Sequence, residues 1–118
     1  MVFIGFVKKL NSTLFSKITS KNELFLLNGK EISYCELCGI VISISSNNII
    51  ICDFFGLMEI YKSADIVPKG KGPFIFIIKL YSKRGTIYGY CKNIRSVSIY
   101  EEISFNIEVK ALIASFCY

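Results

Sequence analysis

Tyrosines and basic residues recur in the second half of the chain with a spacing that could bind a single-stranded nucleic acid. Bases stack on aromatic rings, and lysine or arginine side chains attract the phosphates between them. Alternatively, the same tyrosines are ordinary strand residues with a buried ring and a solvated hydroxyl. Both interpretations stay open for the candidate DNA-contact residues, which are Tyr61, Lys62, Tyr81, Lys83, Arg84 and Tyr88, with Tyr90 beside them.

Residues for catalysis or metal binding are poorly represented. The sequence contains no histidine, which excludes a histidine-based triad and any metal site with a histidine ligand. Its carboxylates are scattered over different predicted elements without pairing, so we expect no enzyme and no catalytic residue. Cys35 and Cys38 form a C-x-x-C pattern, but strand residues three apart point to opposite faces, which spoils a zinc site or redox pair. We therefore expect no metal and no cofactor.

The composition predicts one domain over residues 1–118, with more apolar surface than its own core can bury. Hydrophobic residues make up 53% of the chain and charged residues 19%, and a chain of this length holds a single core. The net charge of +5 permits an anionic partner, although a solvated surface explains it equally well. The apolar run at residues 1–7 lacks a preceding basic region and is short, so we expect no signal peptide and no membrane span.

Apolar runs separated by turn residues predict five strands, at residues 32–44, 49–53, 57–62, 74–81 and 86–97. Gly39 lies within the first and longest strand, and a glycine there allows the bend that lets one strand belong to both sides of a closed barrel. Gly89 is a second candidate bulge. The expected fold is all-β: a five-stranded meander closed as an OB-fold barrel, followed by a C-terminal α-helix.

Two segments precede the predicted barrel. Apolar residues at helical spacing predict a short helix or turn over residues 3–14, and they are Phe3, Phe6, Val7, Leu10 and Leu14. A short apolar run at residues 24–27 then meets Asn28 and Gly29, which are a strong turn signal.

The C-terminal segment predicts a helix over residues 99–115 with two apolar stripes. Ser98 and Glu101 have the spacing of a capping box. One stripe holds Phe105, Val109, Leu112, Ile113 and Phe116, and the opposite side holds Ile103, Ile107 and Ala114. A helix on one barrel needs one stripe, so the second stripe predicts a partner helix or, alternatively, a cover supplied by the chain's own N-terminal segment. Periodicity leaves open which stripe faces the partner.

Several motifs together resemble one family. The OB domain of the middle subunit of replication protein A is similar over roughly residues 13–116, including the passage from last strand to last helix at residues 94–105. The motifs that carry the resemblance are Phe25-x-Leu27-x-Gly29-Lys30-Glu31-Ile32-Ser33, Leu37-x-Gly39-Ile40-Val41-x-Ser43-Ile44 and Asp53-x-x-Gly56-x-Met58-Glu59-Ile60. Here the family's Asp-Gly-Thr-Gly turn is replaced by Asp53-Phe54-Phe55-Gly56.

The resemblance implies a non-catalytic subunit of a heteromeric complex that binds single-stranded DNA in replication, repair and recombination, in the nucleus. The C-terminal helix would join the large and small subunits. From the candidate tyrosines and cations and the short turns beside them, which predict a shallow groove, we expect the isolated chain to bind single-stranded DNA weakly. Other OB-fold subunits of the same layout remain open: the small subunit of the RecQ-mediated genome instability complex, and a Stn1-like telomere subunit. In those settings the chain would be a protein scaffold with little DNA affinity of its own.

Overall fold

Strand β5 (Tyr34–Ile44) is the element around which the barrel closes. Residues 34–40 pair antiparallel with β8 (Pro73–Lys83), and residues 40–44 pair antiparallel with β6 (Asn48–Asp53). Gly39 lies at this change of partner, where an added Cβ would come within 2.7 Å of the Cys52 carbonyl oxygen. The predicted shared strand is thus confirmed. Gly39 allows the close approach of two backbones, and the bulge itself falls at Ile42, between Val41 and Ser43.

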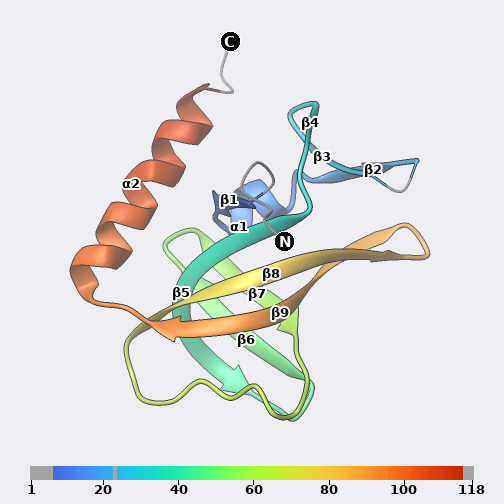
Figure 1. Cartoon of the computed structure of the whole chain (residues 1–118). Helices are drawn as coiled ribbons and strands as arrows, with labels where there is room; N and C mark the ends of the chain where they lie inside the picture. The colour runs from blue at the N-terminus through green and yellow to red at the C-terminus, as the bar shows by residue number, and fades with distance from the viewer. Residues whose placement is uncertain (1–6, 23, 116–118) are drawn as a thin grey trace.

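The remaining strands close the barrel in an order that differs from the predicted meander. Strand β6 pairs with β7 (Gly56–Tyr61), β7 touches β9 (Thr86–Ser96) in parallel, and β9 pairs antiparallel with β8, which returns to β5. The meander was wrong because the fourth strand crosses to the free edge of β5, and the fifth then fills the space beside β7. An all-β, five-stranded OB-fold barrel with a C-terminal helix is confirmed (Figure 1).

The computed structural model describes residues 7–22 and 24–115. Before the barrel come β1 (Val7–Leu10), α1 (Ser12–Phe15) and a separate three-stranded sheet of β2 (Thr19–Lys21), β3 (Leu24–Leu27) and β4 (Lys30–Glu31), which projects from the barrel (Figure 1). The predicted turn between β3 and β4 is confirmed, since Asn28 and Gly29 both have left-handed φ values, +52° and +78°.

The short helix or turn predicted over residues 3–14 was wrong at residues 7–10, although residues 12–14 do lie in α1. Residues 7–10 form β1, which pairs in parallel with residues 34–37 of β5, and Phe3 and Phe6 lie outside the described residues. Asn11 is extended and caps α1 by accepting the Leu14 N–H at 2.8 Å. Residues 7–10 form a strand because pairing with the edge of β5 stabilises them more than a helix would, since only a few residues carry the helical periodicity.

The barrel interior is filled by branched and aromatic side chains, and Leu14 and Ile18 join the core from the α1 region. Gly89 sits in this core, and a Cβ there would collide with Cγ2 of Ile78. The expected bulge at Gly89 was wrong, because the register between β8 and β9 shifts between Ile77 and Ile78 instead, opposite Cys91 and Asn93. Gly89 serves close packing.

Helix α2 (Ile99–Ser115) begins at the predicted capping box: the Glu101 N–H donates to Ser98 Oγ at 3.1 Å, and the Ser98 N–H donates to the Glu101 carboxylate at 3.4 Å. Phe105 and Val109 are buried against the barrel and Leu112 is partly buried, whereas Ile103 and Ile107 are 45% and 63% exposed. Phe116 and the side chains of Ile113 and Ala114 lie outside what the structure describes.

In the described part of the chain, no helix has the length and apolarity needed to cross a membrane.

Candidate nucleic-acid interface

Four tyrosines from three strands form one aromatic group on the outer face of the barrel, which we call the tyrosine cluster: Tyr61, Tyr81, Tyr88 and Tyr90. Tyr81 is paired with Tyr88 across β8 and β9, and Tyr61 with Tyr90 where β7 meets β9. The rings of Tyr81 and Tyr88 stack at 5.7 Å between centroids with an interplanar angle of 19°. Tyr61 meets Tyr88 edge-on at 5.4 Å, and Tyr90 meets Tyr81 edge-on at 6.0 Å.

Cations surround this cluster, and we call them the basic rim: Lys79, Lys83, Arg84 and Lys92. The Lys79 ammonium lies 5.3 Å from the Tyr81 ring centroid, and the Lys92 ammonium lies 5.7 Å from that of Tyr90. Lys79 and Lys92 were not among the contact residues predicted from the sequence, although the alternation of side chains along a strand could have identified them. Each stands two residues from a tyrosine on the same strand, and such residues share a face.

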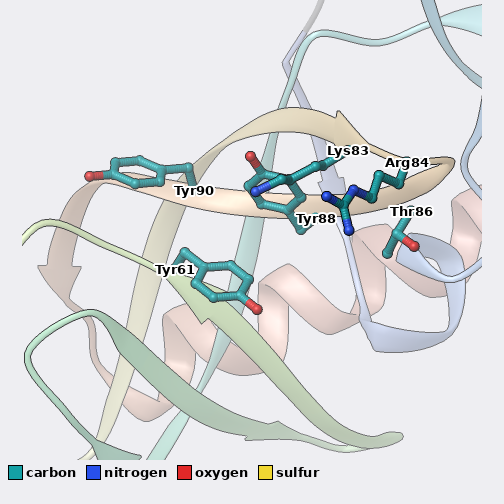
Figure 2. Close-up of a pocket in the computed structure, with 6 residues that line it drawn as sticks. All are labelled: Tyr61, Lys83, Arg84, Thr86, Tyr88 and Tyr90. Atoms are coloured by element: carbon teal, nitrogen blue, oxygen red, sulfur yellow. The ribbon is translucent and has the colours of Figure 1, made fainter.

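A hollow of about 590 Å³ opens between the β8–β9 hairpin and the end of β7. Figure 2 shows the six residues that line it: Tyr61, Lys83, Arg84, Thr86, Tyr88 and Tyr90. The hairpin turn that carries Arg84 is tight, since Arg84 and Gly85 have φ values of +53° and +81°. Aromatic faces beside flexible cations can stack bases and neutralise phosphates, which is the chemistry of a single-strand-binding surface.

Lys62 stands apart from the other predicted contact residues. It is only 4% exposed, and its ammonium donates to the carbonyl oxygens of Ser46 and Ser63 at 3.2 and 3.3 Å. The Lys62 backbone N–H also donates to the Asn47 carbonyl at 3.0 Å. Lys62 therefore fixes the turn between β5 and β6 against the end of β7, while the basic rim supplies accessible charge. Tyr61, Tyr81, Lys83, Arg84 and Tyr88 are brought together as predicted.

The tyrosine cluster ends at a polar pair on the neighbouring strands. Asn48 lies opposite Tyr61 across β6 and β7, and its amide donates to the Glu59 carboxylate at 2.6 Å. Glu59 is exposed. A carboxylate at this position repels phosphates, so it marks a border of the surface suited to a polyanion.

The two cysteines of the C-x-x-C pattern lie on different sides of β5. Cys35 is fully buried, and burial raises the pKa of its thiol far above the usual value. Burial also raises the pKa of Cys38 to about 12, with a smaller contribution from the nearby Glu102 carboxylate of α2. Both therefore stay protonated near neutral pH. Within residues 7–22 and 24–115, no three histidine, cysteine, aspartate or glutamate side chains are grouped to hold a metal ion.

The fold and this surface define an OB-fold protein. The sequence model of the ECU03_1140 family matches residues 35–112, which is well over half of the chain, and the chain belongs to that family. A search of curated proteins found no match.

Solved structures share the fold at low sequence identity. A chain of a replication protein A heterotrimer bound to single-stranded DNA has a TM-score of 0.73 and 14% identity, over 95% of this chain and 98% of its own. A chain of the Stn1–Ten1 complex of S. pombe has a TM-score of 0.72 and 10% identity, over 92% and 91%. A chain of yeast RPA bound to single-stranded DNA has a TM-score of 0.69 and 15% identity, over 89% and 87%.

Proposed function

We propose that the chain is a non-catalytic OB-fold subunit of a heteromeric complex that binds single-stranded DNA, similar to replication protein A and active in the nucleus in replication, repair and recombination. The tyrosine cluster with its basic rim is the observation that carries this proposal. The fold similarity to chains of replication protein A bound to single-stranded DNA supports it.

The surface suits weak binding of a short stretch of single strand. Stacking on an aromatic side chain contributes about 1–3 kcal/mol per base. Two of the four rings already stack on each other, the other two contact them edge-on, and each ring is only partly exposed. The cations of the basic rim project from β8, β9 and the turn between them. We therefore expect micromolar or weaker, salt-sensitive affinity for the isolated chain, with tighter binding once partner subunits extend the surface.

The test is a fluorescence-anisotropy titration of the full chain against a labelled single-stranded oligonucleotide at low and moderate salt. Tyr88→Ala should weaken binding about 5-fold to 100-fold, the range expected when one stacked ring is removed. Tyr100→Ala is the matched control, because Tyr100 is exposed on α2 away from the cluster, and its affinity should stay unchanged. Absence of binding at low salt, or equal losses in both variants, would contradict the DNA-binding proposal.

The exposed stripe of α2 supports assembly with other subunits. Ile103 and Ile107 lie on the side of the helix away from the barrel, together with Ile99 and Tyr100. An apolar stripe of this kind fits another helix. By the resemblance, the partners are the large and small subunits of a replication protein A-like complex. Ile103 and Ile107 would lie at the contact, because Phe105, Val109 and Leu112 are turned toward the barrel.

A protein scaffold of the same fold is the second candidate function, and the same α2 stripe favours it. Affinity purification of the tagged chain, followed by mass spectrometry, separates the two candidates. Recovery of a large and a small single-strand-binding subunit would support the first. Recovery of topoisomerase III or telomere-capping subunits, from a chain that binds no DNA, would support the scaffold.

A further inference from the structure

Strand β5 has a partner on only one of its two edges over residues 41–44. Ile40 pairs at once with Pro73 of β8 and Cys52 of β6, so these two neighbours lie on opposite sides of β5. Strand β8 begins at Pro73, whereas β6 continues along β5 to Ile44. Within the described residues no strand takes the place of β8 beyond Ile40. We call the unpaired side of residues 41–44 the open edge of β5.

The open edge carries backbone groups that a further strand could bind. The Ser45 N–H donates to the Asn48 carbonyl at 2.9 Å, toward β6. Because successive residues of a strand direct their backbone groups to opposite sides, the N–H and C=O of Ile44 point to the open edge. The connection from β7 to β8 is described in full, and no hydrogen bond joins it to Ile44. Unpaired groups of this kind are a template for pairing with another chain.

A hollow of about 430 Å³ lies beside the open edge, where the connection from β7 to β8 passes the end of β5 (Figure 1). Ile44 is 45% exposed, although Ile49 opposite it on β6 is fully buried. The residues that give the hollow its character are mostly apolar: Ile40, Val41, Ile44, Pro68 and Phe74, with Lys71 as the charged one. Side chains of an added strand could therefore be buried here.

The charge beside this hollow is positive. Lys69 and Lys71 are both exposed on the connection, and none of the described residues that line the hollow is acidic. Asp65 also belongs to the connection, but its carboxylate accepts a hydrogen bond from the Ser63 hydroxyl. Two accessible ammonium groups next to an apolar hollow favour a ligand that carries carboxylates.

We propose that the open edge of β5 binds an extended segment of a partner protein in which acidic and apolar residues alternate. The segment adds to the sheet as a strand in line with β8, and its backbone bonds to Ile44. Its apolar side chains enter the hollow, and its carboxylates lie near Lys69 and Lys71. Alternation is required because successive side chains of a strand point to opposite sides.

A nucleic acid fits this position less well than a peptide. Its backbone does not offer the alternating N–H and C=O groups that a strand edge pairs with. Phe74 lines the hollow but is only 2% exposed, so its ring is not free to stack on a base. The open edge and the hollow share no residue with the tyrosine cluster or the basic rim. Partner binding here is therefore separate from the proposed DNA binding.

The test is fluorescence anisotropy of a labelled peptide of about eight residues, alternating aspartate and valine, titrated with the full chain at low salt. The dissociation constant should lie between about 1 μM and 1 mM, as suits a short strand that pairs along one edge. The same peptide with lysine in place of aspartate should bind at least about tenfold more weakly. A third peptide, methylated on alternate backbone nitrogens, should not bind, because it cannot donate to the edge.

Two variants of the chain locate the contact. Lys71→Glu should weaken binding of the aspartate peptide roughly 3-fold to 10-fold, and Lys110→Glu on α2 is the charge-matched control that should leave it unchanged. Ile44→Pro removes the N–H that points to the open edge but no bond to β6, so it should weaken binding by about tenfold or more. Circular dichroism checks that each variant is folded. In the wild type, the peptide should slow hydrogen exchange of the Ile44 amide.

Each contrary result overturns the proposal. Absence of binding at millimolar peptide contradicts it, and so does equal binding of the methylated peptide or of the Lys71→Glu variant. Displacement of the peptide from the Tyr88→Ala variant by a single-stranded oligonucleotide would assign the hollow to a nucleic acid and overturn it as well. Loss of DNA binding in Tyr88→Ala with unchanged peptide binding would show two separate sites and support the proposal.

Discussion

Tyr61 and Tyr90 are direct neighbours where β7 and β9 run parallel, and this pairing brings an aromatic ring from one strand into the group formed by the β8–β9 hairpin. The residues of the candidate surface are therefore assembled by barrel closure. Unpairing β7 from β9 would separate Tyr61 from Tyr88 without disturbing the stacked rings of Tyr81 and Tyr88.

The basic rim should determine how strongly DNA affinity depends on salt, and it should have less influence on which bases are preferred. Replacing Lys83 or Arg84 with alanine should lower the slope of log affinity against log salt by about 0.7 for each phosphate that is no longer neutralised. Affinity for different base sequences should fall by similar factors. Titrations at three or more salt concentrations measure this slope. Lys110→Ala on α2 is the charge-matched control, and an equal change in its slope would argue against a local rim.

Substitutions on the two sides of α2 should have different effects, one on the stability of the chain and the other on its assembly with a partner. Phe105→Ala removes a buried ring and should lower the free energy of unfolding by about 3–5 kcal/mol, because a cavity remains. Leu112→Ala should have a smaller effect, since Leu112 is only partly buried. Ile107→Glu should leave the melting temperature nearly unchanged and weaken partner binding. Thermal melts and co-elution with the partner check both effects, and a destabilised Ile107→Glu variant would contradict the assignment of the two sides.

Replacing Gly39 with alanine should destabilise the barrel at the point where β5 changes its partner from β8 to β6. An added Cβ would approach the Cys52 carbonyl oxygen to 2.7 Å, and two paired backbones have little freedom to move apart. We expect Gly39→Ala to cost about 1–3 kcal/mol in free energy of unfolding, as overpacking does. Urea denaturation measures it, with Ser43→Ala on the exposed end of the same strand as control. Equal stability of Gly39→Ala and the wild type would contradict this prediction, because it would mean that the backbones of β5 and β6 can move apart to accept the added methyl group.

The cap of α2 should weaken in acid. The Arg95 guanidinium, 2.9 Å from the Glu101 carboxylate, together with the Ser98 N–H, holds the pKa of Glu101 below its usual value. A carboxyl with a lowered folded-state pKa stabilises the fold above its unfolded-state pKa, and this contribution disappears as pH falls through the folded-state value. The melting temperatures of wild type and Glu101→Gln should therefore differ at about pH 7 and converge near pH 3. A difference that is constant with pH would contradict this.

The local sequence patterns predicted the strands well. The order of the strands in the barrel could not be predicted from them, because it depends on contacts between segments far apart in the sequence. The strand at residues 32–44 was expected from its apolar length and internal glycine, and β5 forms it from residue 34 to residue 44. The order of β8 and β9 could not be deduced, because antiparallel hairpins are compatible with either a meander or a crossover. The fold at residues 7–10 also depended on a distant partner, β5, which local periodicity does not report.

The candidate surface was predicted in part for the same reason. Alternation places Tyr81, Tyr88 and Tyr90 on one face, but the contribution of Tyr61 depends on the crossover. Lys62 follows Tyr61 directly and was predicted to contact DNA with it, although adjacent strand residues point to opposite sides. The structure places Lys62 inward among backbone carbonyls, so the period of the strand was the overlooked signal.

The ion pair between Lys9 and Glu108 joins the first described strand to the last helix, residues 99 positions apart in the sequence, at 2.8 Å. Strand β1 and α2 also both pack on β5. Because these contacts join segments far apart in the sequence, the native arrangement is completed only after α2 has left the ribosome. Contacts of such long sequence separation slow folding. A nascent chain without α2 would meanwhile expose the apolar side chains that Phe105 and Val109 later cover, and transiently exposed apolar surface favours aggregation.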